Sequence, residues 1–575
     1  MITPRNALGR LAVILLTLGL FGTSCQTKNE ATRAPAKKVD AGRIDQIFAQ
    51  WNRSDSPGAA VVVVQNGEVV FQGGYGLANL ESRTPITPQT VFDAASVAKQ
   101  FTGLAIAMLI EEGKLSLDDD IRKHLPDVPD FGRPITIRHL LHHTSGLRDW
   151  PETLGLSGFG HGAIITMDTI LEMVRRQQEL DFAPGEEYQY CNTSYNLLAA
   201  SVAKVSGESF RGWTDKKLFR PLGMKGTHFC EDPTTPILNR AEAYNPAGEK
   251  KFKRSISQLA AQGSSSLFIS AEDLGKWLVN FQTELVGGKG AFEKMYQPGQ
   301  LKSGAKIDYG FGIGLGKYHG DKTISHSGSW AGYRSYVMHV PEKRFGVGIL
   351  ANSGDMDPTS LARKIADVYF GHSSPPPRKS EERAKANLKV DPSTWDGYLG
   401  TYRLGAGWLL EITREGDRLN TQATREAKFP MEALSETTFF VPAYGASVEF
   451  VRGKSGPAKQ LVYRGIRAPR LDLPKLTESA LQAYVGDYWS EELRVAYRVE
   501  LREGELGVRD RSGEWFGLLP TGADRFDVDQ QRVSVEFARN GGEIAELKVS
   551  GGRIRNIRFV RGLLSKPAKG TVVQR

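Results

Sequence analysis

Residues 391–565 contain an internal repeat with a period of about 87 residues, which indicates two copies of one small structural unit. Both copies are rich in glycine and in alternating polar and apolar residues. The segments that recur in register are YLGTY (398–402) and YVGDY (484–488), REG (414–416 and 502–504), Phe439 and Phe526, and VEF (448–450 and 535–537). The repeat predicts two small all-β domains over residues 391–474 and 475–566. Each is expected to be a lipocalin-like antiparallel barrel or bent sheet of about eight short strands.

The chain before the repeat has an α/β pattern. Asn66-Gly67 separates two apolar runs, at residues 59–65 and 68–72, which predicts a β-hairpin. Apolar residues at helical spacing predict helices from Ser96 to Gly113 and over residues 197–205, and strands are predicted at 333–340 and 345–351. We therefore expect one α/β domain over residues 42–371, whose antiparallel sheet takes strands from both ends of the domain. Residues 372–390, rich in proline and charge, are predicted to be a linker.

The N-terminus has the pattern of an export signal. Arg5 and Arg10 precede an apolar run at residues 11–21, and small residues lead into Cys25. This predicts a signal peptide over residues 1–24, a lipidated Cys25 and a polar tether over residues 25–41. The chain would then be a lipoprotein held to the bacterial cell envelope, facing the periplasm or the exterior. Secretion without a lipid is the alternative. Residues 567–575 are expected to be a tail.

Composition excludes several classes of protein. Hydrophobic residues make up 40% of the 575-residue chain, which is enough for a buried core and excludes a mainly disordered protein. Three cysteines are too few for a disulfide scaffold. The formal net charge of +9 is spread along the chain rather than gathered in a basic stripe, which argues against a nucleic-acid partner. Protein partners are not indicated.

Three Ser-x-x-Lys motifs occur, at Ser96, Ser201 and Ser303. On a helix the lysine shares a face with the serine three residues earlier and can remove its proton if the amine is neutral. Ser96 opens its predicted helix, where its backbone N–H is unpaired and can face developing negative charge. Ser201 lies in the middle of a helical pattern and Ser303 in a glycine-containing loop. Ser96 is therefore the predicted nucleophile and Lys99 its base.

Longer motifs in residues 42–370 resemble the serine β-lactamase and penicillin-binding-protein superfamily, in the branch of class C β-lactamases, D-aminopeptidases, D,D-carboxypeptidases and esterases. Those motifs are residues 90–128 around Ser96, ITIRHLLHHTSGL (135–147), PGEEYQYCN (184–192), LGMKGTHF (222–229), SAEDLGKW (270–277) and His326-Ser327-Gly328. The tandem β domains are similar to those of D-aminopeptidases with two C-terminal domains. The resemblance implies a serine β-lactamase-like domain with an antiparallel sheet flanked by helices, and an acyl-enzyme mechanism without metal or cofactor.

The same resemblance assigns the rest of the site. Tyr190 is expected to pass protons, with a pKa lowered by cations such as Lys99, and Asn192 to hold Lys99 and a substrate amide. His326 and Gly328 are expected to bind substrate, with His326 titrating near pH 6.5 in place of a permanent cation, which argues against a dedicated penicillinase. The backbone N–H groups of Ser96 and Ser329 would form the oxyanion hole.

Other residues have alternative interpretations. Tyr190, Asn192 and His326 could serve packing alone. Cys191 is expected to be a small buried residue, with a Cys191–Cys230 disulfide as the alternative. The histidines at 139, 142 and 143 are expected to pack rather than to bind metal. The glycine-rich residues 149–167 are expected to form a mobile rim that affects the choice of substrate.

The predicted function is that of a hydrolase for small amides or esters, including D-amino-acid peptides, with a small molecule or short peptide as substrate. A class C-like β-lactamase is one alternative. A non-catalytic envelope binding protein with an inactive hydrolase fold is another.

Overall fold

The computed structural model describes residues 41–160, 162–248, 251–372, 392–452 and 456–562. All of them belong to one compact unit, Lys37–Arg575. The predicted signal peptide, Cys25, nearly all of the tether, the linker after residue 372 and the C-terminal tail lie outside the described residues, so those interpretations stay predictions. No helix in the described part of the chain is long and apolar enough to cross a membrane.

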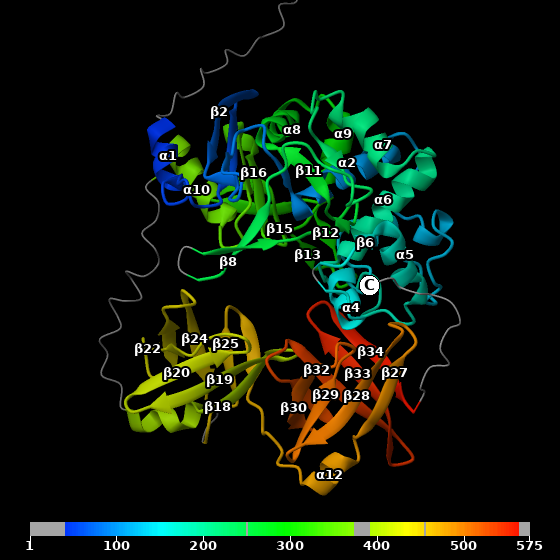
Figure 1. Ribbon diagram of the computed structural model, residues 1–575, viewed down its shortest axis with the longest axis vertical. Helices are drawn as coiled ribbons and strands as arrows, with labels where there is room; N and C mark the ends of the chain where they lie inside the picture. The colour runs from blue at the N-terminus through cyan, green and yellow to red at the C-terminus, as the bar shows by residue number, and fades with distance from the viewer. Residues whose placement is uncertain (1–40, 161, 249–250, 373–391, 453–455, 563–575) are drawn as a thin grey trace, which may run out of the picture. The chain divides into compact units, whose positions relative to one another are not determined.

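The α/β domain (residues 41–372) is built on a six-stranded antiparallel sheet with the order β14-β15-β16-β17-β1-β2. Strands β2, β15 and β16 of this sheet are labelled in Figure 1. The first and last strands of the sheet along the chain are neighbours, because β1 pairs with β17. This confirms the prediction that the sheet takes strands from both ends of the domain. The strands are β1 (Ala59–Gln65), β2 (Glu68–Tyr75), β14 (Gly314–Tyr318), β15 (Asp321–Trp330), β16 (Tyr333–Val340) and β17 (Phe345–Ala351).

The turn between β1 and β2 explains why the hairpin could be predicted. Asn66 and Gly67 both have positive φ, 54° and 83°. Asparagine and glycine tolerate this left-handed region, and a two-residue turn with that geometry matches the twist of the strands it joins.

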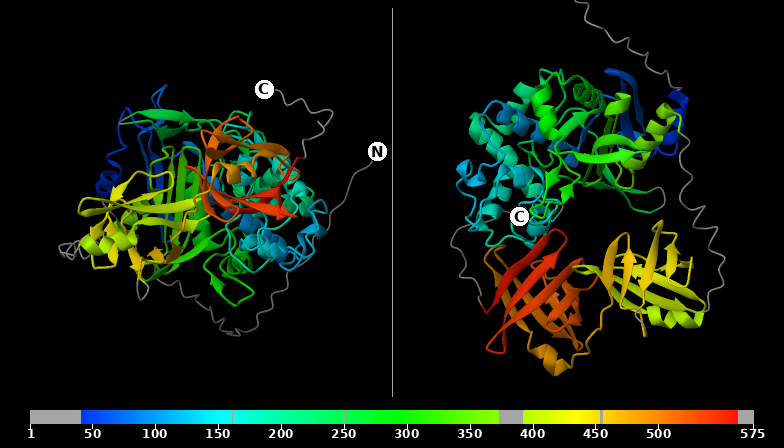
Figure 2. Two further views of the ribbon diagram at one scale, coloured as in Figure 1. Left: turned by 90° about the horizontal axis from the view of Figure 1, so that it is seen from below. Right: turned by 180° about the vertical axis from the view of Figure 1, so that it is seen from behind.

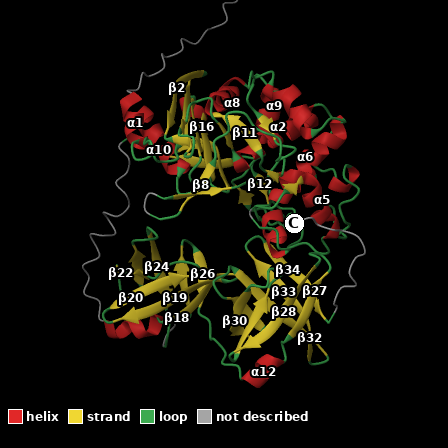
Figure 3. Ribbon diagram, viewed as in Figure 1, coloured by secondary structure: helices red, strands yellow, loops and turns green. Residues whose placement is uncertain are grey.

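Strand β1 is buried on both faces, as its continuous apolar sequence requires. Ala59, Val61 and Val63 belong to an apolar cluster with helices α1 (Ala41–Phe48) and α10 (Pro358–Phe370). Ala60, Val62 and Val64 belong to the larger cluster on the opposite face, with α8 (Ala271–Thr283). Because successive side chains of a strand alternate between faces, the sheet is covered by helices on both sides (Figure 3).

The larger cluster also contains the helices that carry the site. They are α2 (Ala98–Glu111), α3 (Ile137–Leu141), α4 (Trp150–Leu156), α5 (Met167–Arg176), α6 (Asn192–Ser206), α7 (Phe210–Thr214) and α9 (Gly288–Met295). Helix α4 lies in the segment that was expected to be a mobile glycine-rich rim. Trp150 and Leu154 are buried, so they anchor this part of the segment in the core.

Short strands complete the α/β domain. They are β3 (Leu77–Asn79), β4 (Thr84–Pro85), β5 (Val91–Asp93), β6 (Ile165–Thr166), β7 (His228–Phe229), β8 (Ala243–Pro246), β9 (Phe252–Ser255), β10 (Leu259–Ala260), β11 (Leu267–Ser270), β12 (Gly299–Gln300) and β13 (Lys306–Ile307). Strand β5 matters most for the site, because it pairs with β11 and ends directly before the Ser96 turn.

The second repeat forms a closed eight-stranded antiparallel barrel, here called the closed barrel (residues 486–561), as predicted (Figure 2). Its strands are β27 (Gly486–Ser490), β28 (Val495–Arg502), β29 (Glu505–Arg509), β30 (Trp515–Gly522), β31 (Arg525–Val528), β32 (Val533–Asn540), β33 (Glu543–Gly551) and β34 (Ile554–Arg561), preceded by α12 (Glu478–Gln482).

The first repeat differs, because its strands fall into two sheets of four and five strands; we call it the two-sheet unit (residues 400–469). The sheets separate where Pro430 ends β21, and proline cannot donate a ladder hydrogen bond. A bridge between Tyr402 and Arg470 joins the outer ends. The strands are β18 (Gly400–Gly405), β19 (Trp408–Glu415), β20 (Arg418–Ala423), β21 (Phe429–Pro430), β22 (Glu432–Ala433), β23 (Thr438–Val441), β24 (Ala446–Val451), β25 (Gln460–Tyr463) and β26 (Ile466–Pro469).

The two repeats nevertheless share a structural core. The Tyr402 hydroxyl donates to the Tyr398 carbonyl at 2.9 Å, and the Tyr488 hydroxyl donates to the Tyr484 carbonyl at 2.7 Å. In each repeat, the first tyrosine of this pair packs against two phenylalanines. The aromatic residues that reveal the repeat in the sequence therefore belong to the core of each copy.

Candidate functional site

Ser96 lies in a one-turn 3-10 helix, Ala95–Val97, which leads directly into α2. Ala95 has a φ of 47°, a left-handed conformation that is costly for a residue with a Cβ atom. The Asp93 carboxylate accepts a hydrogen bond from the Ala95 N–H at 2.9 Å, and the Ser335 hydroxyl of β16 donates to the Ala94 carbonyl at 2.7 Å. These contacts hold the strained turn that presents Ser96.

Lys99 is completely buried in the first turn of α2 and lies beside Ser96. Its Nζ atom donates to Asn192 Oδ1 at 2.8 Å and to the Ser264 carbonyl at 2.7 Å, and lies 3.3 Å from Ser96 Oγ. Burial lowers the pKa of Lys99 well below its ordinary value. A neutral amine has two N–H donors and one lone pair. Because Asn192 and Ser264 use both donors, the lone pair faces the Ser96 hydroxyl.

Asn192 is the first residue of α6, and Asp149 holds it in place. One Asp149 oxygen accepts from the Asn192 backbone N–H at 2.5 Å, and the other accepts from the side-chain Nδ2 at 3.0 Å. A carboxylate only accepts, so Nδ2 must face Asp149 and Oδ1 must face Lys99. This fixes the amide orientation. Burial raises the pKa of Asp149, whereas Arg553, at 3.0 Å, lowers it.

Tyr190 lies over the same lysine, with its ring centre 4.8 Å from Lys99 Nζ. Burial raises the pKa of Tyr190, whereas a lowered pKa was expected. The expectation assumed a cationic Lys99, but the buried amine favours its neutral form. The nearby Ser96 hydroxyl lowers the pKa of Tyr190, but burial has the larger effect. The Tyr190 hydroxyl is buried and has no partner in hydrogen-bond geometry among the described residues, so it is a phenol positioned to exchange a proton.

His326 lies on β15 and is buried, and its hydrogen bonds fix its tautomer. The Ser327 carbonyl, 2.7 Å from Nδ1, can only accept, so Nδ1 carries the proton and Nε2 accepts from the Tyr309 hydroxyl at 2.9 Å. Burial is the largest of the effects that lower the pKa of His326 to about 3. The side chain is therefore neutral at pH 7, whereas the sequence suggested a group titrating near pH 6.5.

Gly328 and Ser329 follow His326 along β15, next to the Ser96 turn. A Cβ atom on Gly328 would lie 2.3 Å from the Ala94 carbonyl oxygen and 3.1 Å from the Ser96 nitrogen. Beyond Ser325, β15 pairs with β16 on one edge, and no described strand pairs with its other edge. This part of β15 has an edge on which an extended substrate could bind beside Ser96.

The other predicted candidates lie apart from this group. The Ser201 hydroxyl donates to the Leu197 carbonyl inside α6, and Ser303 lies in the loop between β12 and β13. The described cysteines, Cys191 and Cys230, are buried free thiols, so the alternative of a disulfide between them is wrong.

The histidines at 139–143 bind separate backbone groups. His139 accepts from the Thr136 N–H, His142 contacts the Tyr309 carbonyl, and His143 accepts from the Cys191 N–H. Ligand atoms that could hold a metal ion converge elsewhere among the described residues. They belong to His319, Asp367 and His372, near the β14–β15 turn and the end of α10.

Several residues of the site were not identified from the sequence. Asp149, the Ser264 carbonyl and Tyr309 contact predicted site residues directly, and Arg553 reaches Asp149 from the closed barrel. One signal was present for Asp149, because Arg148-Asp149 forms a charged pair between the apolar residues Leu147 and Trp150. No signal in the sequence pointed to Arg553, because its loop is remote in sequence from every motif of the α/β domain.

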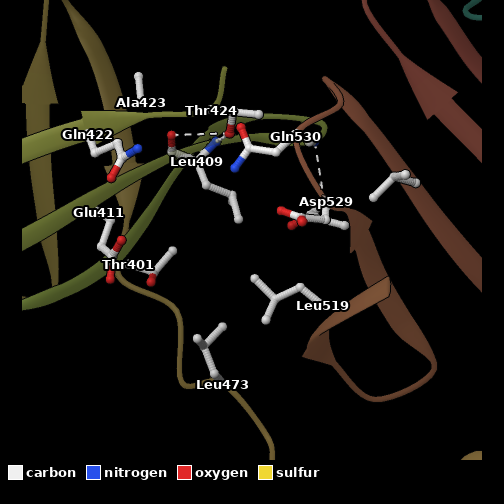
Figure 4. Close-up of a pocket in the computed structure, with 13 residues that line it drawn as sticks. Thr401, Leu409, Glu411, Gln422, Ala423, Thr424, Leu473, Leu519, Asp529 and Gln530 are labelled. Carbon is white, nitrogen blue, oxygen red and sulfur yellow. Dashed lines mark hydrogen bonds between the residues drawn. The ribbon is translucent and has the colours of Figure 1, made fainter. Parts of the chain in front are cut away.

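A separate cavity lies between the two-sheet unit and the closed barrel (Figure 4). Its volume is about 280 Å³, and its walls combine leucines with acidic and amide groups, among them Leu409, Leu473, Leu519, Glu411 and Asp529. No residue of the α/β domain lines it, so it is distinct from the Ser96 group.

The chain is similar in sequence to known proteins of two kinds. The chain is 28% identical over 437 residues to a penicillin-binding protein of Bacillus subtilis, covering 73% of this chain and 96% of that protein. It is 29% identical over 331 residues to a D-aminopeptidase of Brucella canis, covering 58% of this chain and 62% of that protein. The chain thus spans less than two thirds of the D-aminopeptidase.

A solved octameric penicillin-binding protein homologue from Pyrococcus abyssi has the same fold, with a TM-score of 0.55 at 23% identity, covering 83% of this chain and 99% of that chain. The sequence model of the family described as Beta-lactamase matches residues 44–370. The chain therefore belongs to the Beta-lactamase family of serine hydrolases.

Proposed function

We propose that this chain hydrolyses small amides or esters, including peptides of D-amino acids, through an acyl-enzyme on Ser96. The observation that carries the proposal is the Lys99 amine. It is buried, its two donors are occupied, and its lone pair faces Ser96 Oγ at 3.3 Å. A neutral amine in this position is a base for a serine nucleophile. The similarity to a D-aminopeptidase supports the substrate class.

In the proposed reaction, Lys99 accepts the Ser96 proton while Oγ forms a bond to the substrate carbonyl carbon. The backbone N–H groups of Ser96 and Ser329 stabilise the negative oxygen of the tetrahedral intermediate. Lys99 then returns the proton through the Tyr190 phenol to the leaving nitrogen or oxygen, whose bond to the carbonyl carbon breaks. Water repeats these steps on the acyl-enzyme and releases Ser96.

The neutral state of His326 affects which substrates we expect the site to bind. A neutral imidazole offers no permanent charge for a substrate carboxylate, so we expect binding to depend on hydrogen bonds and shape. This favours amides and esters over penicillins.

The test compares the parent with Ser96→Ala. We expect a fluorophosphonate probe to add one label to the parent and none to the variant, by intact-protein mass spectrometry. A panel of D-amino-acid amides, short-chain esters and nitrocefin then assigns the substrate. Fast nitrocefin turnover would instead indicate a class C-like β-lactamase. Absence of both labelling and turnover in the parent would leave a binding protein and refute the proposal.

A further inference from the structure

The closed barrel contributes one side chain to the site. Arg553 lies in the two-residue loop between the paired residues Gly551 and Ile554, which joins β33 to β34. Its guanidinium lies 3.0 Å from Asp149 Oδ2 and donates to Glu152 Oε1 at 3.1 Å. It also lies 5.4 Å from the centre of the Tyr190 ring.

Contacts other than these ion pairs hold the loop in place. The Gln189 amide donates to the Arg553 carbonyl at 3.0 Å, and the Arg555 N–H donates to Asp181 at 2.8 Å. A Cβ atom on Gly552 would lie 3.2 Å from Glu152 Cγ, so the loop backbone packs against α4. These contacts hold the backbone of the loop independently of the Arg553 charge.

Arg553 is the first member of a chain of contacts that ends at the base. Asp149 binds Arg553 on one side and both N–H groups of Asn192 on the other. Asn192 then accepts from Lys99 at 2.8 Å. An ionised Asp149 is what fixes the Asn192 amide, but a buried carboxylate without a counter-charge would take up a proton.

Asp149 and Arg553 have opposite effects on the pKa of Lys99. Asp149 raises the pKa of Lys99, and Arg553 lowers the pKa of both Lys99 and Asp149. With Arg553 present, Asp149 can stay ionised while Lys99 stays neutral. Without it, the pair would hold an extra proton at the same pH.

We propose that Arg553 is a positioning residue through which the closed barrel keeps Asp149 ionised, Asn192 oriented and Lys99 ready to accept the Ser96 proton. This inference rests on the proposed function, because it assigns a role in preparing the base of that reaction. Arg553 acts through Asp149 rather than on the reacting atoms.

Few other groups around Lys99 change charge near neutral pH. Burial raises the pKa of Cys191 to about 12 and raises those of Tyr190 and Tyr195, and it lowers those of His143 and His326. Glu152 faces Asp149 from α4. The acidic limb of the acylation rate should therefore report the Lys99–Asp149 pair.

The test follows fluorophosphonate labelling of Ser96 from pH 6 to 9 in the full chain. Arg553→Gln removes the charge, and Arg553→Lys restores a cation. Arg555→Gln is the matched control, since Arg555 lies on the same hairpin and pairs with Glu187 rather than Asp149. Circular dichroism and urea unfolding verify that each variant is folded.

We expect the acidic limb of Arg553→Gln to move upward by about one pH unit, with labelling about tenfold slower at pH 7 and close to the parent at pH 9. Arg553→Lys should recover most of the loss, and Arg555→Gln should retain the parent profile. An unchanged profile in Arg553→Gln, or an equal loss at every pH, would overturn the positioning role while leaving the hydrolase intact. A parent that does not label at Ser96 would overturn both proposals.

Discussion

The backbone of Gly328 packs directly against the carbonyl oxygen of Ala94. A Cβ atom on Gly328 would lie 2.3 Å from that oxygen and 2.2 Å from Ser335 Oγ. Strand β15 can therefore approach the Ser96 turn only because residue 328 has no side chain. This approach brings Gly328, which precedes Ser329, next to the Ser96 nitrogen.

Gly328→Ala should separate β15 from the Ser96 turn. Because removal of an oxyanion donor costs about 100-fold or more in rate, we expect Ser96 labelling to slow by about 100-fold. Gly316→Ala on β14 is the control, since its Cβ would meet only the Thr323 hydroxyl at 3.0 Å, at the end of a side chain that can rotate. Parent-like labelling of Gly328→Ala would contradict the proposed geometry.

Tyr190→Phe should slow the labelling of Ser96 while changing the stability of the protein little. The buried Tyr190 hydroxyl has no partner in hydrogen-bond geometry among the described residues, so its removal should change the free energy of unfolding by less than about 1 kcal/mol. Labelling should slow by about 100-fold or more, as expected for loss of a proton-transfer group. Tyr195→Phe offers a comparison in urea unfolding, because its hydroxyl donates to the Leu141 carbonyl at 2.8 Å and its loss should cost about 1 kcal/mol. Normal labelling by Tyr190→Phe would exclude the proton relay.

Acid should destabilise the α/β domain through its buried histidines. Burial lowers the pKa of His339 to about 4, and it is the largest of the effects that lower the pKa of His326 to about 3. Below pH 6.5 the unfolded chain binds protons that the folded chain excludes, so stability is present above pH 6.5 and is lost as the pH falls toward 4. For His339 the loss reaches about 3 kcal/mol. Urea midpoints at pH 8, 6.5 and 5 should fall less steeply in His339→Gln than in the parent; equal slopes would show that His339 contributes nothing.

The contact between the α/β domain and the closed barrel depends on a buried charge cluster. Arg148 lies between Asp181 at 2.7 Å and Glu492 at 2.5 Å, and at most 4% of any of these side chains is exposed. Arg148→Met removes the cation that lies between the two buried carboxylates and should cost about 3–5 kcal/mol in urea unfolding at pH 8. Glu492→Gln keeps the Arg148–Asp181 pair and should cost clearly less. Equal losses in the two variants would argue against this account.

Local patterns were sufficient for much of the fold. Asn66-Gly67 predicted the first hairpin, and the strands predicted at residues 333–340 and 345–351 have the bounds of β16 and β17. The two-sheet form of the first repeat was missed because residues 429–430 pair with β20 whereas residues 432–433 pair with β23, and the sequence does not show which strand each residue pairs with. Helix α4 was missed because glycines around it obscured the buried Trp150 and Leu154.

In the site, the structure brings together Ser96, Lys99, Tyr190 and Asn192, which sequence motifs had identified. The protonation of Tyr190 and His326 was not predictable, because burial sets the direction of both pKa shifts and burial is a property of the packed structure. Arg553 was hidden for a related reason. A hydrogen-bonded contact between two distant loops leaves no periodic pattern in either.

The two repeats differ at the loop that carries Arg553. The corresponding hairpin of the two-sheet unit, β25 to β26, has Arg464-Gly465 where the closed barrel has Gly552-Arg553. Arg464 donates back to the Tyr444 carbonyl of its own unit at 2.7 Å, whereas Arg553 reaches out to Asp149. One member of a duplicated pair can thus gain an accessory role in another domain's chemistry through the order of two residues in a turn, while the aromatic cores of both copies are preserved.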